Sequence, residues 1–165
     1  MLFRSIISVR LADQEKPKLY YFITYTVTNR TGEEQLFVPE INILTDAGDL
    51  IRANRNLSPA VFKAIKDRVR NPLLESPNQI IGRILQGADN ARDGVLIWPV
   101  PDHDVDHLSI FFGGLSGETH SIKDPATGEE KLLRKTLQLE YATPGDQPHT
   151  PEKPIVFKAK TWIVR

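Results

Sequence analysis

Residues 19–49, LYYFITYTVTNRTGEEQLFVPEINILTDAGD, decide the fold class of this chain. The first part alternates between apolar and polar residues with a period of two, as a strand with one buried face does. The apolar positions on that face are Leu19, Tyr21, Ile23, Tyr25 and Val27. Turn-forming residues follow at 29–33, and a second apolar run leads into another turn at 46–49. We therefore expect an antiparallel β-hairpin.

The remainder of the chain continues this β pattern, with glycine and proline between the apolar runs. We expect about eight strands, at residues 2–11, 18–29, 35–45, 79–86, 94–100, 106–113, 131–142 and 154–164. Short strands at this spacing are typical of a sandwich. At 165 residues the chain is long enough for one core. The sequence predicts a mostly β, immunoglobulin-like antiparallel β-sandwich that forms a single domain over residues 1–165.

One segment, residues 59–70, has helical rather than strand periodicity. Ser58 suits the N-cap and Pro59 the first helical position. The predicted buried stripe is Val61, Ile65 and Val69, and the predicted exposed residues are Lys63, Lys66 and Arg70. We expect one inserted helix that packs on the sandwich.

The composition excludes several classes of protein. Lysine plus arginine and aspartate plus glutamate both number 21, and cysteine is absent, which rules out disulfide scaffolds and thiolate metal sites. No apolar run is long enough for a transmembrane helix. Basic residues are not interleaved with aromatic ones, so we expect no nucleic-acid binding. The first expected strand begins at residue 2, which favours a periplasmic or cell-envelope protein whose export signal has been removed, with a cytoplasmic protein as the alternative.

Several segments carry a family resemblance. They are TVTNRTGEEQ at 26–35, INILTDAGDL at 41–50, LQGADNARDGVLIWPVP at 85–101 and DHLSIFF at 106–112. This string resembles the bacterial telokin-like, immunoglobulin-type domains over residues 20–112. The whole chain, with its GLSGE and RKTLQLEY segments, is also similar to uncharacterised proteins of planctomycete-type bacteria. The resemblance implies a cell-envelope module and brings no catalytic residue with it.

Charge is segregated along the chain. Six basic residues and one acid occupy residues 52–70, whereas five acids and one basic residue occupy residues 89–106. The candidate partner-contact residues are Arg52, Arg55, Lys63, Lys66 and Arg70. Such a basic helix face suits an anionic partner, or self-association through the acidic segment. The alternative is a solvated helix face without a partner.

A second group of residues has the chemistry of metal ligands. It consists of His103, His107, Glu118 and His120. Imidazole and carboxylate bind zinc and other transition metals. Strand alternation separates the histidines of residues 102–107 from the neighbouring aspartates, so a polar turn explains the segment better. A ligand-binding or metal-binding domain at these residues is the alternative function.

No catalytic set is evident. The segment GGLSGE has no glycine two residues after Ser116, so it is not the G-x-S-x-G nucleophile elbow. We expect Trp98 in the core, whereas Trp162 alternates with lysines and can point outward. The predicted function is a non-enzymatic interaction or scaffold module of the bacterial cell envelope, without a cofactor.

Overall fold

The structure, a computed structural model, describes residues 4–9, 16–101, 105–142 and 156–165. It contains eleven strands, one α-helix and one short 3-10 helix within these ranges. The elements are β1 (Arg4–Val9), β2 (Lys18–Val27), β3 (Gln35–Phe37), β4 (Glu40–Thr45), β5 (Leu50–Arg52), α1 (Pro59–Val69), β6 (Gly82–Ile84), η1 (Ala88–Asn90), β7 (Arg92–Pro99), β8 (His107–Gly113), β9 (Thr119–Lys123), β10 (Glu130–Ala142) and β11 (Val156–Val164).

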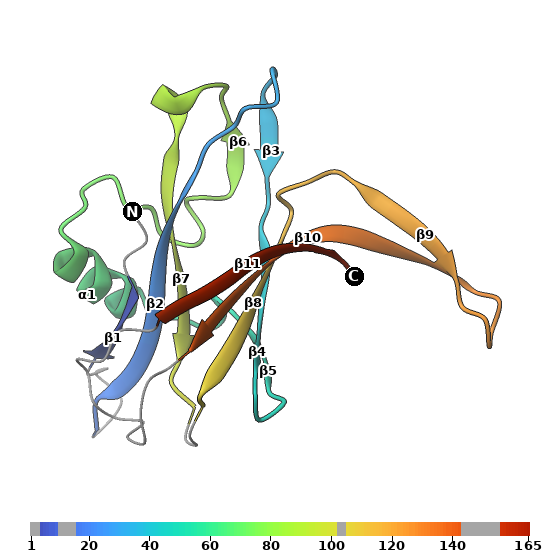
Figure 1. Cartoon of the computed structure of the whole chain (residues 1–165). Coiled ribbons are helices and arrows are strands. Elements are labelled where there is room, and N and C mark those ends of the chain that lie inside the picture. Colours follow the sequence, from blue (N-terminus) through green and yellow to red (C-terminus); the bar gives the residue numbers. More distant parts are fainter. Residues whose placement is uncertain (1–3, 10–15, 102–104, 143–155) are drawn as a thin grey trace.

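Two antiparallel sheets form the body of the molecule (Figure 1). The small sheet has the order β1-β2-β7, and the large sheet has the order β11-β10-β8-β4-β5. Strand β9 pairs with the first part of β10, and β3 pairs with β6 as a separate two-stranded sheet. The predicted fold class, a mostly β sandwich with one helix, is confirmed.

The main core lies between the two sheets. The rings of Tyr21 of β2 and Trp98 of β7 lie 5.5 Å apart with a tilt of 31°, and they pack with Ile43 and Ile110 of the large sheet. All four side chains are at most 5% exposed. The expectation that Trp98 belongs to the core is therefore confirmed. Burial of this apolar area is the main source of the sandwich's stability.

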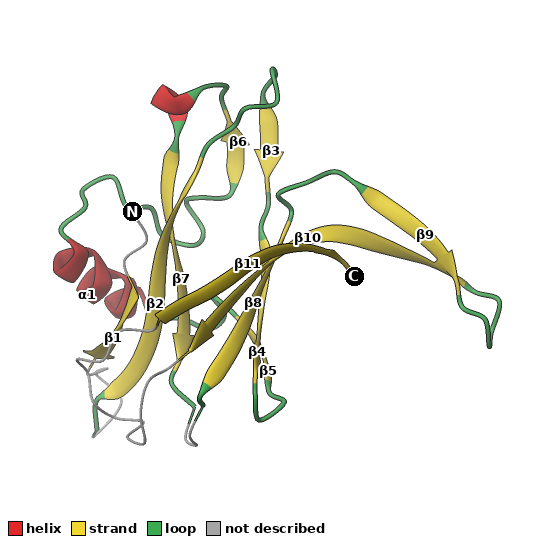
Figure 2. Cartoon of the chain, in the orientation of Figure 1, coloured by secondary structure: helices red, strands yellow, loops and turns green. Residues whose placement is uncertain are grey.

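A second core lies on the other face of the small sheet, beneath α1 (Figure 2). Ile65 and Val61 of the helix are fully buried against Phe22 of β2 and Ile97 of β7. The helix covers a face that would otherwise meet solvent, and this explains why β2 and β7 are buried on both sides. The predicted helix is confirmed, with bounds of 59–69 in place of 59–70.

The predicted hairpin between residues 18–29 and 35–45 is wrong. Strand β2 pairs with β1 and β7, whereas β4 lies in the opposite sheet and pairs with β5 and β8. The turn residues at 29–33 instead belong to a connection that crosses from the small sheet to the large sheet. The buried Asn29 amide donates to the carbonyls of Glu33 at 2.7 Å and Ile84 at 2.9 Å, which fixes this crossover. The predicted 35–45 strand also divides at Pro39, which has no N–H for a ladder.

Strand β10 is thirteen residues long and is used twice. Residues 135–142 pair with β11 and residues 137–142 with β8 in the large sheet, whereas residues 130–134 pair with β9. The β9–β10 hairpin extends away from the sandwich as an arm (Figure 1), and every residue of β9 is exposed. Strands β5 and β9, which are not among the eight expected strands, are only three and five residues long.

Candidate functional site

A groove with a volume of about 580 Å³ lies on the outer face of the large sheet. We call it the arginine groove and define it by Asn42, Arg52, Arg55, Phe111, Arg134 and Arg165. Asn42 of β4 is paired with Arg52 of β5 on one side and with Phe111 of β8 on the other. Directly paired residues share a face of the sheet, so these three side chains form one row across it.

Glycine keeps the middle of the groove open. Gly113 ends β8 and is paired with Glu40, so the row next to Phe111 has no side chain on β8. Gly114 follows with a φ of 81°, and a Cβ there would lie 2.6 Å from the Val38 carbonyl oxygen. The chain can leave β8 in this direction only with glycine at that position.

The four arginines stand on two sides of the groove. Arg52 and Arg55 come from β5 and the segment that follows it, whereas Arg134 and Arg165 come from β10 and the end of β11. The backbones of Arg134 and Arg165 exchange hydrogen bonds of 2.7 and 3.2 Å, which places the two residues opposite each other. The Arg165 guanidinium lies 4.3 Å from the centre of the Phe111 ring and is held there by a cation–π contact.

The groove carries an excess of positive charge. Within the described residues, none of its four guanidinium groups forms an ion pair or a hydrogen bond. Glu40 is the one acidic residue that the described part of the chain contributes to the lining. Some basic residues elsewhere do form ion pairs, for example Lys135 with Glu118 at 2.8 Å. The groove therefore offers guanidinium donors to an anion from outside.

Asn42 adds a neutral polar group to the floor. It is only 7% exposed, but its amide atoms still reach solvent, and they form no hydrogen bond within the described part of the chain. The neighbouring Thr136, by contrast, is satisfied internally, because its hydroxyl donates to the Arg134 carbonyl at 3.1 Å. The Asn42 amide is thus free to bind whatever occupies the groove.

The predicted basic patch is divided by the structure. Arg52 and Arg55 belong to the groove, whereas Lys63, Lys66 and Arg70 follow α1 on the outer face of the small sheet. Lys63 and Arg70 are exposed, as predicted. Lys66 is half-buried, which corrects the prediction, because its ammonium group donates to the Leu74 carbonyl at 3.0 Å.

The predicted acidic segment does not form one patch among the described residues. The Asp93 carboxylate accepts hydrogen bonds from Thr26 at 2.7 Å and Asn71 at 2.8 Å. Asp89 lies in η1, just before β7 begins. Asp106 lies after the other end of β7, just before β8 begins. The remaining acids, at 102 and 104, lie outside the described residues. Self-association through this segment stays a prediction.

The candidate metal ligands are not gathered. His103 lies outside the described residues, His107 begins β8, and Glu118 and His120 lie beyond the other end of that seven-residue strand. The Lys135 ammonium binds Glu118 and lowers the pKa of its carboxyl. No group of three or more potential ligands occurs in the ranges that the structure covers. Metal binding in this region stays an untested alternative.

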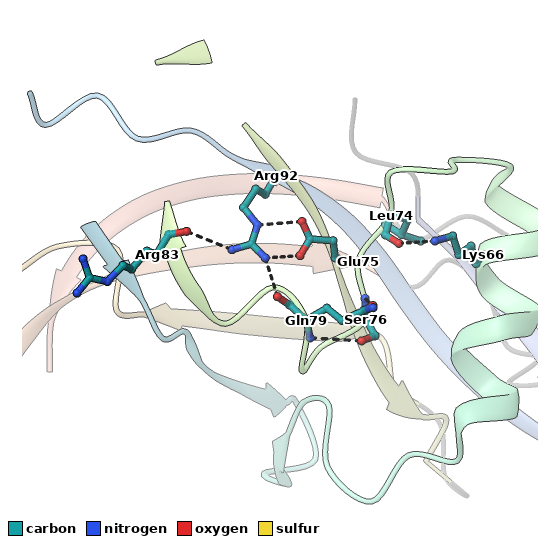
Figure 3. A network of polar contacts seen from close by, with 7 residues as sticks. All are labelled: Lys66, Leu74, Glu75, Ser76, Gln79, Arg83 and Arg92. Atoms are coloured by element: carbon teal, nitrogen blue, oxygen red, sulfur yellow. Dashed lines mark hydrogen bonds and ion pairs between the residues drawn. The ribbon is translucent and has the colours of Figure 1, made fainter. Parts of the chain in front are cut away.

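Another polar network fixes the segment between α1 and β6 (Figure 3). The Arg92 guanidinium forms two hydrogen bonds to the Glu75 carboxylate, one of them 2.8 Å long, and donates to the Gln79 carbonyl at 2.6 Å. Both charged side chains are about a quarter exposed. The Arg92 and Glu75 charges satisfy each other, so we interpret the network as structural.

No family model, curated protein or solved structure matches this chain. The resemblance to telokin-like domains therefore stays a prediction. Within the described ranges, no helix combines the length and the apolar character of a membrane span. The site is thus interpreted from its geometry alone.

Proposed function

We propose that this protein is a non-enzymatic interaction module that binds a negatively charged partner in the arginine groove. The observation that carries the proposal is the set of four guanidinium groups around one groove, none of them paired within the described residues. An isolated surface arginine is ordinary, but four around a single hollow create a local positive potential.

Arginine suits such a role for physical reasons. Its planar guanidinium donates two parallel hydrogen bonds to a carboxylate or phosphate, and it stays charged at any pH that the protein meets. The contact of Arg165 with Phe111 restricts one of these side chains before a partner arrives. Less side-chain entropy is then lost on binding. Because the groove is open to solvent, salt should weaken the interaction.

A location in the bacterial cell envelope is part of the same proposal. It rests on the resemblance of residues 20–112 to telokin-like domains. Finding an export signal or lipoprotein signal encoded upstream of Met1 would support this location. A gene that starts at Met1 without such a signal would contradict it.

The proposal is tested with a fluorescent poly-L-glutamate chain, whose binding is followed by anisotropy. Arg52→Gln/Arg134→Gln removes one charge from each side of the groove, and we expect binding to weaken by about tenfold or more. Lys63→Gln/Arg70→Gln removes the same charge from α1 and serves as the matched control, with binding within about twofold of wild type. Circular dichroism verifies that both variants fold. Equal binding by the groove variant and wild type would overturn the proposal.

A further inference from the structure

The geometry points to a specific class of partner: we infer that the arginine groove binds an extended acidic peptide whose backbone pairs with the Asn42 amide. This inference rests on the proposed function and deepens it, because that function requires only an anion. Three features of the groove support a peptide.

The first feature is the distance between the two arginine sides. Strands β4 and β8 lie between β5 and β10 in the sheet. Three steps of about 4.8 Å separate β5 from β10, and Arg134 lies four residues along β10 from Gln138, the residue in line with Arg52. The two arginine backbones are therefore roughly 19 Å apart. One carboxylate or phosphate is too small to bind both sides. The ligand must therefore carry at least two anionic groups that are held apart.

An extended peptide can bridge this distance. Side chains at positions i and i+4 of a strand point the same way and lie roughly 13 Å apart. Long arginine side chains can lean inward by several ångströms each, so acidic residues about four positions apart reach both sides. The residues between them then pass over Asn42 and Phe111.

The second feature is the Asn42 amide. An asparagine side chain offers both donor hydrogens and an acceptor oxygen. A peptide unit has the complementary carbonyl and N–H, so one peptide group can use both functions. A phosphodiester or polyphosphate chain has acceptors only and leaves the Asn42 oxygen unpaired. A ligand that covers this oxygen without bonding to it removes its water and leaves it unpaired, which costs binding free energy.

The third feature is the mixed lining of the groove. Glu40 places a carboxylate beside the arginines, which repels a dense polyanion but accepts a hydrogen bond from a peptide N–H. Val38, 51% exposed, and the half-buried Phe111 offer apolar surface to the neutral side chains of a peptide. A partner that alternates acidic and small apolar residues fits this lining better than a uniformly charged polymer.

The test uses three labelled probes with the full chain: a peptide with Asp-Ala-Ala-Ala-Asp at its centre, the same peptide with an ester in place of its central amide, and inorganic polyphosphate. We expect the peptide to bind, and the ester to bind about fivefold to tenfold more weakly, because it lacks one N–H donor. Asn42→Leu should weaken peptide binding by about tenfold and leave polyphosphate binding within about twofold.

Each outcome decides between the two proposals. Equal affinity for peptide and ester, or unchanged peptide binding by Asn42→Leu, would overturn the role of Asn42. Binding of polyphosphate without peptide would overturn the peptide inference and leave the anion-binding function in place. If neither the peptide nor polyphosphate binds, both the peptide inference and the anion-binding function are overturned. The ester comparison uses unaltered protein, so the test holds even if Asn42→Leu does not fold.

Discussion

The ring of Tyr25 lies directly over Gly94, its partner on the neighbouring strand. A Cβ added to Gly94 would lie 2.4 Å from Cζ and 2.6 Å from the hydroxyl oxygen of Tyr25. The other residues of β7 have larger side chains. At Gly94 the Tyr25 ring of β2 occupies the volume that a side chain would fill. The pair fixes the register of the small sheet.

Gly94→Ala should therefore destabilise the domain, because the new methyl group displaces the Tyr25 ring from the core. We expect a loss of about 1–3 kcal/mol in the free energy of unfolding, measured by urea titration. Gly117→Ala is the matched control, since no atom lies within 4 Å of its added Cβ, and it should be neutral. Equal midpoints for the two variants would contradict the packing described here.

Tyr25→Phe should stabilise the protein. The Tyr25 hydroxyl is buried and has no hydrogen-bond partner among the described residues. Removing an unpaired buried hydroxyl should raise the free energy of unfolding by about 1 kcal/mol. A lower melting temperature in the variant would show that the hydroxyl does have a partner.

The same residue gives the protein a pH dependence. Burial raises the pKa of Tyr25 above its usual value of 10.0. As the pH rises past 10, the phenol ionises in the unfolded chain while the folded one keeps its proton, so stability falls. Comparison of wild type with Tyr25→Phe between pH 9 and 11 isolates this effect. The variant should lose less stability over that interval, and parallel curves would contradict the assignment.

Glu75→Gln should loosen the segment between α1 and β6. The change leaves the Arg92 guanidinium, only 24% exposed, without its carboxylate, which we expect to cost about 1–2 kcal/mol in unfolding free energy. Glu34→Gln breaks the exposed pair with Arg83 and should cost less than about 0.5 kcal/mol. Urea titration of both variants checks the contrast, and equal losses would mean that burial gives the Arg92 pair no added strength.

Ile65→Asp tests whether α1 is an integral layer. Ile65 is fully buried beneath the helix, so the variant places an unpaired carboxylate in the second core. We expect a loss of about 3 kcal/mol or more, with Lys63→Ala on the exposed face as the near-neutral control. If Ile65→Asp melts near the wild-type temperature, the helix is a loose appendage.

Elements with strong local signals were predictable from the sequence. Ser58 and Pro59 mark the start of α1, the period of three to four marks its buried face, and the apolar run around Trp98 marks a buried strand. Strand pairing was not predictable in the same way. The residues at 29–33 are typical of a hairpin turn. In the structure, however, the Asn29 side chain bonds to the Glu33 and Ile84 carbonyls and fixes a connection between the two sheets.

The groove depends on pairing, and this explains why the sequence revealed only Arg52 and Arg55. Asn42, Phe111, Arg134 and Arg165 come from different strands, and only the register of the large sheet brings them together. The alternation of residues 133–141 puts Arg134 on a polar face of its strand, but no local pattern shows which residues lie beside that face. Lys66 was placed in solvent because helical spacing does not show a carbonyl within reach of its long side chain.

The most direct test of the account locates the ligand on the protein. An NMR titration with the Asp-Ala-Ala-Ala-Asp peptide should shift the side-chain amide of Asn42 and the backbone amides at 40–42, 52–55, 111–114 and 134–136. The amides of 59–69 in α1 should not move. Shifts confined to α1, or no shifts at millimolar peptide, would contradict the assignment of the arginine groove as the binding surface.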